Sequence, residues 1–195
     1  MTSKPALLIA IGGLPATGKT TLADTLAQNF TDMAKETHRI NSDTERKTLW
    51  AKENNQACDL YKKLPVEAYS AEFRTKSYTQ LFTAVASAIQ TNDVVIIDAS
   101  FTSEDQRTEL ADLAKKQGSL FAGIWLNATT ETMMNRADAR AQSTEKSISD
   151  ADGAIVKLQL KSDLGVISWP QIDANKCTQT VHFHALNAIS NALAL

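Results

Sequence analysis

The chain has 195 residues, 43% of them hydrophobic and 22% charged, which is ordinary for a globular domain with a single core. Its length leaves no room for a second domain of ordinary size, so we expect one domain over residues 1–195. Twenty Lys and Arg residues against 22 Asp and Glu residues give a net charge of −2, which argues against a protein whose main role is to coat nucleic acid or an anionic membrane.

Two cysteines and the start of the chain bear on the cellular compartment. Cys58 and Cys177 lie far apart and form no disulfide framework or metal motif, so we expect a reducing, cytoplasmic location. No apolar run approaches the ~20 residues that a membrane helix needs. Lys4 followed by the apolar residues 6–11 has the outline of a secretory signal, but this run is short and leads into a glycine loop, which favours a buried strand.

Hydrophobic runs alternate with helical patterns along the whole chain. In chain order we expect strand Ala6–Ile11, helix Lys19–Phe30, strand His38–Asn41, helix Asp43–Lys52, helix Pro65–Gln90, strand Val94–Ile97, helix Ser103–Gln117, strand Leu120–Leu126, helix Thr130–Ala141, helix Asp150–Lys161, strand Thr180–Phe183 and helix Leu186–Leu195. Strands without polar alternation are buried on both faces, which is typical of a parallel sheet between helices. The pattern therefore predicts an α/β fold with a parallel five-stranded sheet and helices on both faces.

A glycine-rich motif follows the first predicted strand and opens the first predicted helix. Residues 13–20 read Gly-Leu-Pro-Ala-Thr-Gly-Lys-Thr and match the phosphate-loop (Walker A) pattern G-x-x-x-x-G-K-[ST] in full. Its glycines let backbone amides converge on a phosphate, and the helix N-terminus adds partial positive charge. Lys19 can reach the β- and γ-phosphate oxygens, and the Thr20 hydroxyl can bind Mg²⁺. The predicted nucleotide-binding residues are Gly13, Leu14, Pro15, Ala16, Thr17, Gly18, Lys19, Thr20 and Thr21.

The base is predicted to be adenine because a guanine-selecting motif is missing. The nearest candidate for N-K-x-D is Asn175–Thr178, which lacks the carboxylate that pairs with the guanine edge. Adenine can be held by backbone contacts and stacking, which leave little trace in a sequence. Trp169 or Pro170 could form one wall of such a site, and an ordinary core or surface position accounts for Trp169 equally well.

One acidic residue follows the apolar run 94–97. Asp98 stands where the carboxyl end of a strand faces the crevice, so it fits the Walker B carboxylate that orients Mg²⁺. A helix N-cap is the alternative, but Thr102 or Ser103 fits that role better. The next residue is Ala99 and not the glutamate common in motor-type ATPases, which argues against a motor.

A second acidic residue follows the second predicted strand. Asp43 could face an acceptor site and take a hydroxyl proton. Arg46 lies one helical turn further on the same face and could hold an acceptor or a phosphate. A simple helix cap formed by Asp43 or Ser42 explains the spacing equally well.

Two arginines on one helix face precede a polar connector, residues 141–149. Arg136 and Arg140 are four residues apart and could close over a transferring phosphate as lid cations. The alternative is a solvated helix face with ion pairs to Glu131 and Asp138, and the spacing alone favours that alternative. The connector is either a mobile lid or a plain loop.

Taken together, these motifs resemble the small AAA-type P-loop kinases that look like zeta toxins. Related groups are the polynucleotide 5′-hydroxyl kinases and the C-terminal ATP-binding domain of some aminoglycoside-phosphotransferase-like proteins. The resemblance spans about residues 6–175, and its pieces are 13–21, 42–47, 95–101, Arg107, Arg136 with Arg140, 149–151 and 169–173. The phosphate loop is unspecific, whereas S-D-x-x-R-K and I-D-A-S-F in this order are more telling, although Ser100 replaces the more usual threonine.

The resemblance implies an ATP:hydroxyl phosphotransferase with a nucleoside-monophosphate-kinase-like sheet and a lid at about residues 136–150. The roles that it implies are a general base for Asp43, acceptor ligands for Arg46 and Arg107, magnesium ligation for Thr20 and Asp98, and phosphate-directed cations for Lys19, Arg136 and Arg140. Acceptor specificity in such folds lies in a variable region, here about residues 51–79. Its aromatic residues either line a pocket or pack a helix.

Three functions follow from these patterns. The leading one is a Mg²⁺-dependent kinase that transfers the γ-phosphoryl of ATP to a hydroxyl of a small molecule. A polynucleotide 5′-kinase is an alternative, which the D-x-x-R spacing favours and the acidic net charge disfavours. An ATP-dependent switch or regulatory ATP-binding protein is the alternative of another class, and the presence of Asp43 and the lack of a carboxylate after Asp98 argue against it.

Overall fold

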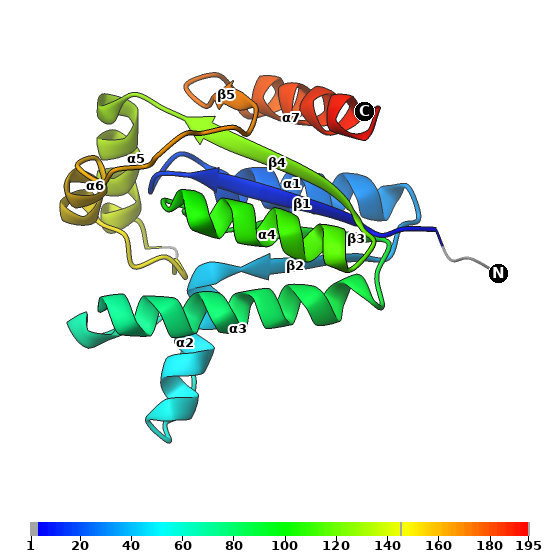
Figure 1. Ribbon diagram of the computed structural model, residues 1–195. Coiled ribbons are helices and arrows are strands. Elements are labelled where there is room, and N and C mark those ends of the chain that lie inside the picture. The colour runs from blue at the N-terminus through cyan, green and yellow to red at the C-terminus, as the bar shows by residue number, and fades with distance from the viewer. Residues whose placement is uncertain (1–3, 145, 195) are drawn as a thin grey trace.

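A computed structural model describes residues 4–144 and 146–194. Within these residues, five parallel strands form one sheet in the order β2-β3-β1-β4-β5 (Figure 1). The strands are β1 (Leu7–Gly13), β2 (Thr37–Asn41), β3 (Val94–Asp98), β4 (Leu120–Asn127) and β5 (Gln171–Asp173). The predicted α/β fold with a parallel five-stranded sheet is confirmed.

Helices cover both faces of the sheet, as expected. They are α1 (Lys19–Asp32), α2 (Ser42–Glu53), the 3₁₀ turn η1 (Val66–Tyr69), α3 (Ala71–Ile89), α4 (Glu104–Lys116), α5 (Thr130–Gln142), α6 (Gly153–Gln159) and α7 (Thr178–Leu193). Helices α1 and α7 pack on one face, while α3 and α4 pack on the other (Figure 1). None of the helices in the described part of the chain is long and apolar enough to cross a membrane.

Strand β1 occupies the centre of the sheet and is buried along its whole length. Leu7, Ile9 and Ile11 pack with α1 and α7, whereas Leu8 and Ala10 pack with α3 and α4. Because both faces are covered, the strand shows no polar alternation. Full burial of each large aliphatic side chain contributes about 1.5–3 kcal/mol to folding. This burial holds β1 in the centre of the sheet, and the phosphate loop begins at its carboxyl end.

The strand register brings three segments to one edge of the sheet. Asp98 at the end of β3 pairs with Ile11 of β1 and with Asn41 of β2. The carboxyl ends of β1, β2 and β3 therefore meet, which is where open parallel sheets bind ligands. The loop after β1, the start of α2 and the end of β3 all lie at this edge.

The end of the chain differs from the prediction. The expected strand Thr180–Phe183 and the start of the expected helix Leu186–Leu195 both lie within α7, and the last strand is the short β5. Helix α7 buries Val181, Ala185 and Ile189, which are four residues apart and lie on one helical face. Residue 195, like residue 145 of the predicted lid and residues 1–3, lies outside the described residues.

Two predicted helices begin later than expected. The segment after Pro65 forms only the η1 turn, because Ser70 is extended and its hydroxyl accepts the Phe73 amide at 3.2 Å to start α3. Asp152 starts α6 in the same way, with its carboxylate accepting the amides of Ala154 and Ile155, both at 3.1 Å. Both caps satisfy amides that have no intrahelical partner.

Candidate phosphate-transfer site

The loop between β1 and α1 has the backbone that a phosphate loop requires. Gly13 has φ 141° and Gly18 has φ 95°, a region that residues with side chains rarely adopt. A Cβ atom at Gly13 would also stand 2.7 Å from the Leu126 carbonyl oxygen. The loop therefore depends on glycine at both positions and opens directly into the N-terminus of α1.

Lys19 lies in the first turn of α1, and its amino group donates to the Leu14 carbonyl oxygen at 2.9 Å. Removal of the ammonium group from water lowers its pKa from 10.5 to about 8, against the opposing effect of the Asp98 and Asp43 carboxylates. Keeping the Lys19 ammonium charged therefore costs the ligand-free protein folding free energy. An anionic ligand next to the ammonium would offset that cost.

Asp98 is almost completely buried, with 1% of its surface exposed, and its carboxylate is surrounded by donors. The Thr20 hydroxyl donates to it at 2.9 Å, the Asn41 amide at 2.8 Å and the Arg39 guanidinium at 3.3 Å. Ser103 occupies the N-cap of α4, so the alternative that Asp98 caps this helix is wrong. The phosphate loop and the end of β3 are thus joined through the Thr20 and Asp98 side chains.

The Thr20 and Asp98 oxygens fit a magnesium site that is completed by a nucleotide. Mg²⁺ prefers oxygen ligands and is commonly held by one or two protein groups together with substrate phosphates and water. No group of three or more His, Cys, Asp or Glu side chains that could hold a metal occurs among residues 4–144 and 146–194. The donor set suits an ion that arrives with phosphates, and it does not suit a cage made of protein alone.

Asp43 faces the same edge of the sheet from the first turn of α2. The Asn41 side chain caps this helix by accepting the amides of Asp43 and Thr44, both at 3.0 Å. The alternative that Asp43 or Ser42 forms the cap is therefore wrong, and the Asp43 carboxylate is not used for it. This carboxylate instead accepts a hydrogen bond from the Arg46 guanidinium at 2.6 Å.

A cavity of about 290 Å³ collects most of the predicted site residues. It is lined by Pro15, Ala16, Gly18, Lys19, Thr20, Thr21, Asn41, Ser42, Asp43, Asp98, Arg136, Arg140 and Ser149. The lining combines the phosphate loop, two carboxylates and three cationic side chains. Such a cavity can hold phosphates beside a group that accepts a proton.

The two arginines of α5 contact backbone carbonyls. Arg136 donates to the Ala16 and Thr17 oxygens of the phosphate loop at 3.4 and 3.3 Å, and to the Ala174 oxygen at 2.8 Å. Arg140 donates to the Ala151 oxygen at 2.7 Å. Neither arginine forms an ion pair within the described ranges, so the solvated-face alternative does not describe these side chains.

Arg107 is not brought to this cavity. It is 2% exposed, and its guanidinium donates to the carbonyl oxygens of Phe101 at 2.6 Å, Leu164 at 2.6 Å and Val166 at 2.9 Å. Burial lowers its pKa. The structure thus corrects its assignment as an acceptor ligand, because the guanidinium is used by backbone carbonyls, two of which belong to the segment before β5.

A smaller cavity of about 200 Å³ lies beside the phosphate loop. It is lined by Thr17, Gly18, Thr21, Leu22, Arg136, Ala174, Lys176, Thr178 and Val181. Trp169 is absent from this lining and is buried instead, with its ring 5.3 Å from the Phe101 ring centroid. The core interpretation of Trp169 is correct, and the Pro170 carbonyl next to it pairs with the Trp125 amide at 2.9 Å.

A family model described as an AAA domain matches residues 8–162 of the chain. The chain belongs to this AAA domain family. The match covers β1 to α6 and so includes the phosphate loop, Asp43, Asp98 and both α5 arginines. No curated protein matches the chain.

Solved structures share the fold of this AAA domain. A gluconokinase from Sinorhizobium meliloti 1021 has a TM-score of 0.63 at 14% identity over 96% of this chain and 93% of that chain. The APS kinase of Mycobacterium tuberculosis in complex with AMPPNP and APS has a TM-score of 0.65 at 12% identity over 98% and 99%. A chain of the Pnkp1/Rnl/Hen1 RNA repair complex has a TM-score of 0.55 at 18% identity over 82% and 45%. The shared feature is the P-loop kinase fold.

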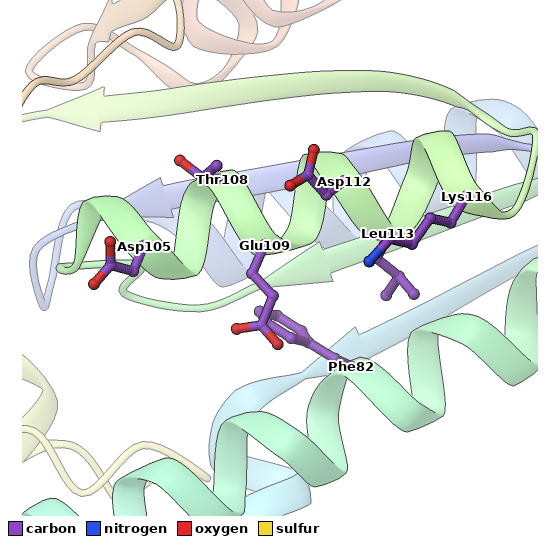
Figure 2. A pocket seen from close by; sticks show the side chains of 7 residues that line it. All are labelled: Phe82, Asp105, Thr108, Glu109, Asp112, Leu113 and Lys116. Atoms are coloured by element: carbon purple, nitrogen blue, oxygen red, sulfur yellow. The ribbon is translucent and has the colours of Figure 1, made fainter.

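A groove between α3 and α4 of the AAA domain is larger, at about 420 Å³, but lies elsewhere (Figure 2). Its lining consists of Phe82, Asp105, Thr108, Glu109, Asp112, Leu113 and Lys116. Figure 2 shows the Glu109 carboxylate extending toward the Phe82 ring. None of the predicted site residues lines this groove. It is therefore not part of the phosphate site, although it is larger.

The variable region and its surroundings combine packing that the sequence indicates with a contact that it does not reveal. Phe73 and Tyr78 are buried in the core, as the packing alternative predicted. The buried Lys47 ammonium pairs with Asp150 at 2.8 Å, a contact between residues 103 positions apart. Lys47 and Asp150 both lie in segments that carry the family resemblance, 42–47 and 149–151. That shared membership was the one sign in the sequence that they could be linked.

Proposed function

We propose that the protein is a kinase that transfers the γ-phosphoryl group of ATP to a hydroxyl group of a small polar acceptor. The observation that carries this proposal is the position of Asp43. Its carboxylate borders the cavity that also contains Lys19, Thr20 and Asp98. It is not needed as a helix cap, because Asn41 is the N-cap of α2. An acidic group that is not used for capping and that shares a cavity with a phosphate loop is suited to orient a hydroxyl nucleophile.

Asp43 serves as the acceptor-side base in this proposal. The acceptor oxygen forms a bond to the γ-phosphorus, the bond between that phosphorus and the β–γ bridging oxygen breaks, and the hydroxyl proton passes to the Asp43 carboxylate. Because the transition state of phosphoryl transfer is loose, the carboxylate mainly orients the hydroxyl before it takes the proton. The 2.6 Å contact with Arg46 fixes the orientation of the carboxylate.

The remaining residues act on the phosphates. Loop amides and Lys19 bind the β- and γ-phosphate oxygens, and Arg140 stabilises the charge shared between the entering and leaving oxygens. Arg136 holds the loop itself through the Ala16 and Thr17 carbonyls. Thr20 and Asp98 would hold Mg²⁺, which supplies charge neutralisation on the phosphate oxygens when bound.

The nucleotide would place its base in the smaller cavity beside the loop. Gly18, Thr21 and Arg136 line both this cavity and the larger one, so a base there would be continuous with phosphates at Lys19. This assignment replaces the suggestion that Trp169 forms one wall of the adenine site. The lid at about residues 136–150, the acceptor region at about residues 51–79, the cytoplasmic location and the narrower relation to zeta toxins remain predictions of the same proposal.

A polynucleotide 5′-hydroxyl kinase is the second candidate. The Asp43–Arg46 pair supports it, because a D-x-x-R arrangement suits a hydroxyl next to a phosphate, and one protein of similar fold belongs to an RNA repair complex. The test is binding to a single-stranded oligonucleotide at several salt concentrations. A kinase of small molecules shows no strong salt-dependent binding, whereas a polynucleotide kinase loses affinity steeply as salt rises.

The central experiment is a screen of hydroxyl compounds for ADP formation with ATP and Mg²⁺. We expect ADP release to rise when a matching acceptor is present, and a phosphorylated acceptor to appear in equal amount. ATP binding without any acceptor-stimulated release would instead identify an ATP-dependent switch. The Lys19→Ala variant is the control, because loss of the loop lysine removes transfer whichever hydroxyl serves as acceptor.

A further inference from the structure

A buried ion pair connects two segments that are remote in sequence and adjacent to the site. Lys47 of α2 is 2% exposed, and the side chain of Asp150 is 7% exposed. The Lys47 ammonium donates to the Asp150 carboxylate at 2.8 Å and to the carbonyl oxygens of Leu60 at 3.0 Å and Lys62 at 2.9 Å. All three of its donor positions are therefore used, which a buried ammonium requires.

Asp150 is equally well partnered on its other oxygen. That oxygen accepts the Leu64 amide at 3.1 Å and a hydrogen bond from the Tyr69 hydroxyl. Burial and the contact with Asp150 raise the pKa of Tyr69, so the hydroxyl stays a donor. We use the name latch for the three side chains Lys47, Tyr69 and Asp150, which bind residues 60–69 to the segment before α6.

One end of the latch reaches the acceptor side of the cavity. The Arg46 guanidinium lies 5.4 Å from the centroid of the Tyr69 ring and also pairs with Asp43. Arg46 is thus held between an aromatic face and a carboxylate, both of which limit its orientation. The position of Tyr69 therefore bears on the position of the proposed base.

The other end of the latch reaches the phosphate side. Ser149, next to Asp150 in sequence, lines the cavity, and the carbonyl oxygen of Ala151 on its other side accepts from Arg140. Asp152 then caps α6. Figure 1 shows the yellow segment between α5 and α6 reaching the end of β2, where α2 begins. Anchoring Asp150 thus anchors the two residues that contact the cavity and Arg140.

We propose that the latch is a positioning device, through which residues 60–69 and the segment 149–152 are locked together so that Asp43 and Arg140 keep their places in the lining of the cavity. Stability alone does not require an ion pair here, because well-packed apolar side chains stabilise a buried site as well or better. A fully hydrogen-bonded pair instead fixes one register between the segments. The expected effect on transfer rests on the proposed kinase function. The locking of the two segments does not depend on that function.

The chain offers a matched control. Lys63 and Asp152 form a second ion pair at 3.0 Å between the same two segments, but both side chains are exposed. Such exposed pairs contribute little. The Asp152→Asn variant therefore removes a contact of the same topology, keeps the oxygen that caps α6 and leaves the latch intact.

Hydrogen exchange of the free protein tests the locking directly. In Asp150→Asn the side chain has one acceptor oxygen, so either Lys47 or the Leu64 amide with Tyr69 faces an NH₂ group. We expect amides of residues 60–69 and 149–152 to exchange faster together, by about tenfold or more, while β1 stays protected. Tyr69→Phe, which keeps the ring on Arg46, should give a smaller change in the same segments, and it carries the test if Asp150→Asn does not fold.

Steady-state kinetics with MgATP and the hydroxyl compound that gives the fastest ADP release in the screen described above test the role in transfer. We expect kcat of Asp150→Asn to fall by about tenfold or more, with the KM for ATP within about threefold, because misplaced groups reduce transfer more than binding. Asp152→Asn should match the wild type in both assays. Faster exchange in only one segment, or loosening of both with unchanged kcat, would overturn the proposal. Absence of turnover in the wild type with every hydroxyl compound of the screen would refute the kinase and leave the exchange result to decide on the latch.

Discussion

The unfavourable position of the Lys19 ammonium gives a quantitative prediction about stability. Its pKa of about 8, compared with 10.5 for the free side chain, means that the fold disfavours the charged form. At about 1.4 kcal/mol for each pH unit between these values, the charge at pH 7 costs the folded protein about 3 kcal/mol. Replacement by methionine, which has a similar length and no charge, removes this cost but also loses the hydrogen bond to Leu14, worth about 1–2 kcal/mol.

We therefore expect Lys19→Met to unfold at a higher urea concentration than the wild type at pH 7 without nucleotide, by about 1–2 kcal/mol in the free energy of unfolding. The sign of the pH dependence follows from proton binding. Between pH 8 and 10.5 the unfolded chain holds the Lys19 proton and the folded chain does not, so wild-type stability rises with pH in this window. The advantage of Lys19→Met should thus be constant below pH 8 and shrink as the pH rises toward 10.5.

The assay is urea unfolding of both proteins at a series of pH values from 7 to 10.5, read as the difference between them. Groups other than Lys19 titrate in both proteins and cancel in that difference. A less stable Lys19→Met protein at pH 7, or a difference that does not change with pH, would refute the reasoning. The same variant should bind MgATP at least about 100-fold more weakly, because its stability comes from the loss of a phosphate-binding charge.

Three further predictions concern other contacts. In the double variant Arg136→Ala/Arg140→Ala, kcat should fall more than the KM for ATP rises, and steady-state kinetics that match the wild type would remove both from the mechanism. Arg107→Ala should lower the free energy of unfolding by about 3 kcal/mol while ATP affinity at 25 °C stays unchanged, since it leaves one buried and two partly buried carbonyl oxygens without their donor. Gly123→Ala should destabilise the fold by about 1–3 kcal/mol in the same unfolding assay, because its Cβ would stand 2.5 Å from the Trp169 ring.

The centre of the fold was predictable because its signals are local. Seven consecutive buried residues, 7–13, read as an apolar run, and the glycine motif marks where the strand ends and α1 begins. Ser103 likewise marks the start of α4 by its type alone. In these segments the sequence pattern and the tertiary surroundings favour the same structure.

The last strand was mispredicted because two periods compete in one segment. Val181 and Phe183 alternate with polar neighbours as in a strand, yet Phe183 is 61% exposed. The pattern that the fold uses is Val181, Ala185 and Ile189, which has the helical spacing. The true strand β5 has three residues with one buried side chain, Ile172, which is too short to produce a periodic signal.

The role of Asp43 could not be decided from spacing because three adjacent polar residues can each start a helix. Which of Asn41, Ser42 and Asp43 caps α2 depends on where β2 ends. The pairing of Asn41 with Asp98 sets that end, and it is a contact between residues 57 positions apart. The cap therefore becomes visible only once the sheet has been assembled.

The neighbours of long side chains were the least predictable feature of the structure. Arg107 finds its partners in segment 164–166, and Trp169 packs on Phe101 and over Gly123. The sequence does not indicate these neighbours, because each belongs to an element that is distant in the chain. The Lys47–Asp150 ion pair of the latch was not predicted for the same reason, because its two residues are 103 positions apart.

The measurement that tests the central claim most directly is acceptor-dependent ADP release by Asp43→Asn. Asparagine keeps the size of the side chain and an oxygen that can accept the Arg46 hydrogen bond, but it takes no proton and carries no charge. We predict MgATP affinity close to that of the wild type and acceptor phosphorylation lower by about 10²-fold or more. Because Asn41 and not Asp43 caps α2, thermal stability should change little. Full transfer activity in Asp43→Asn would contradict the account.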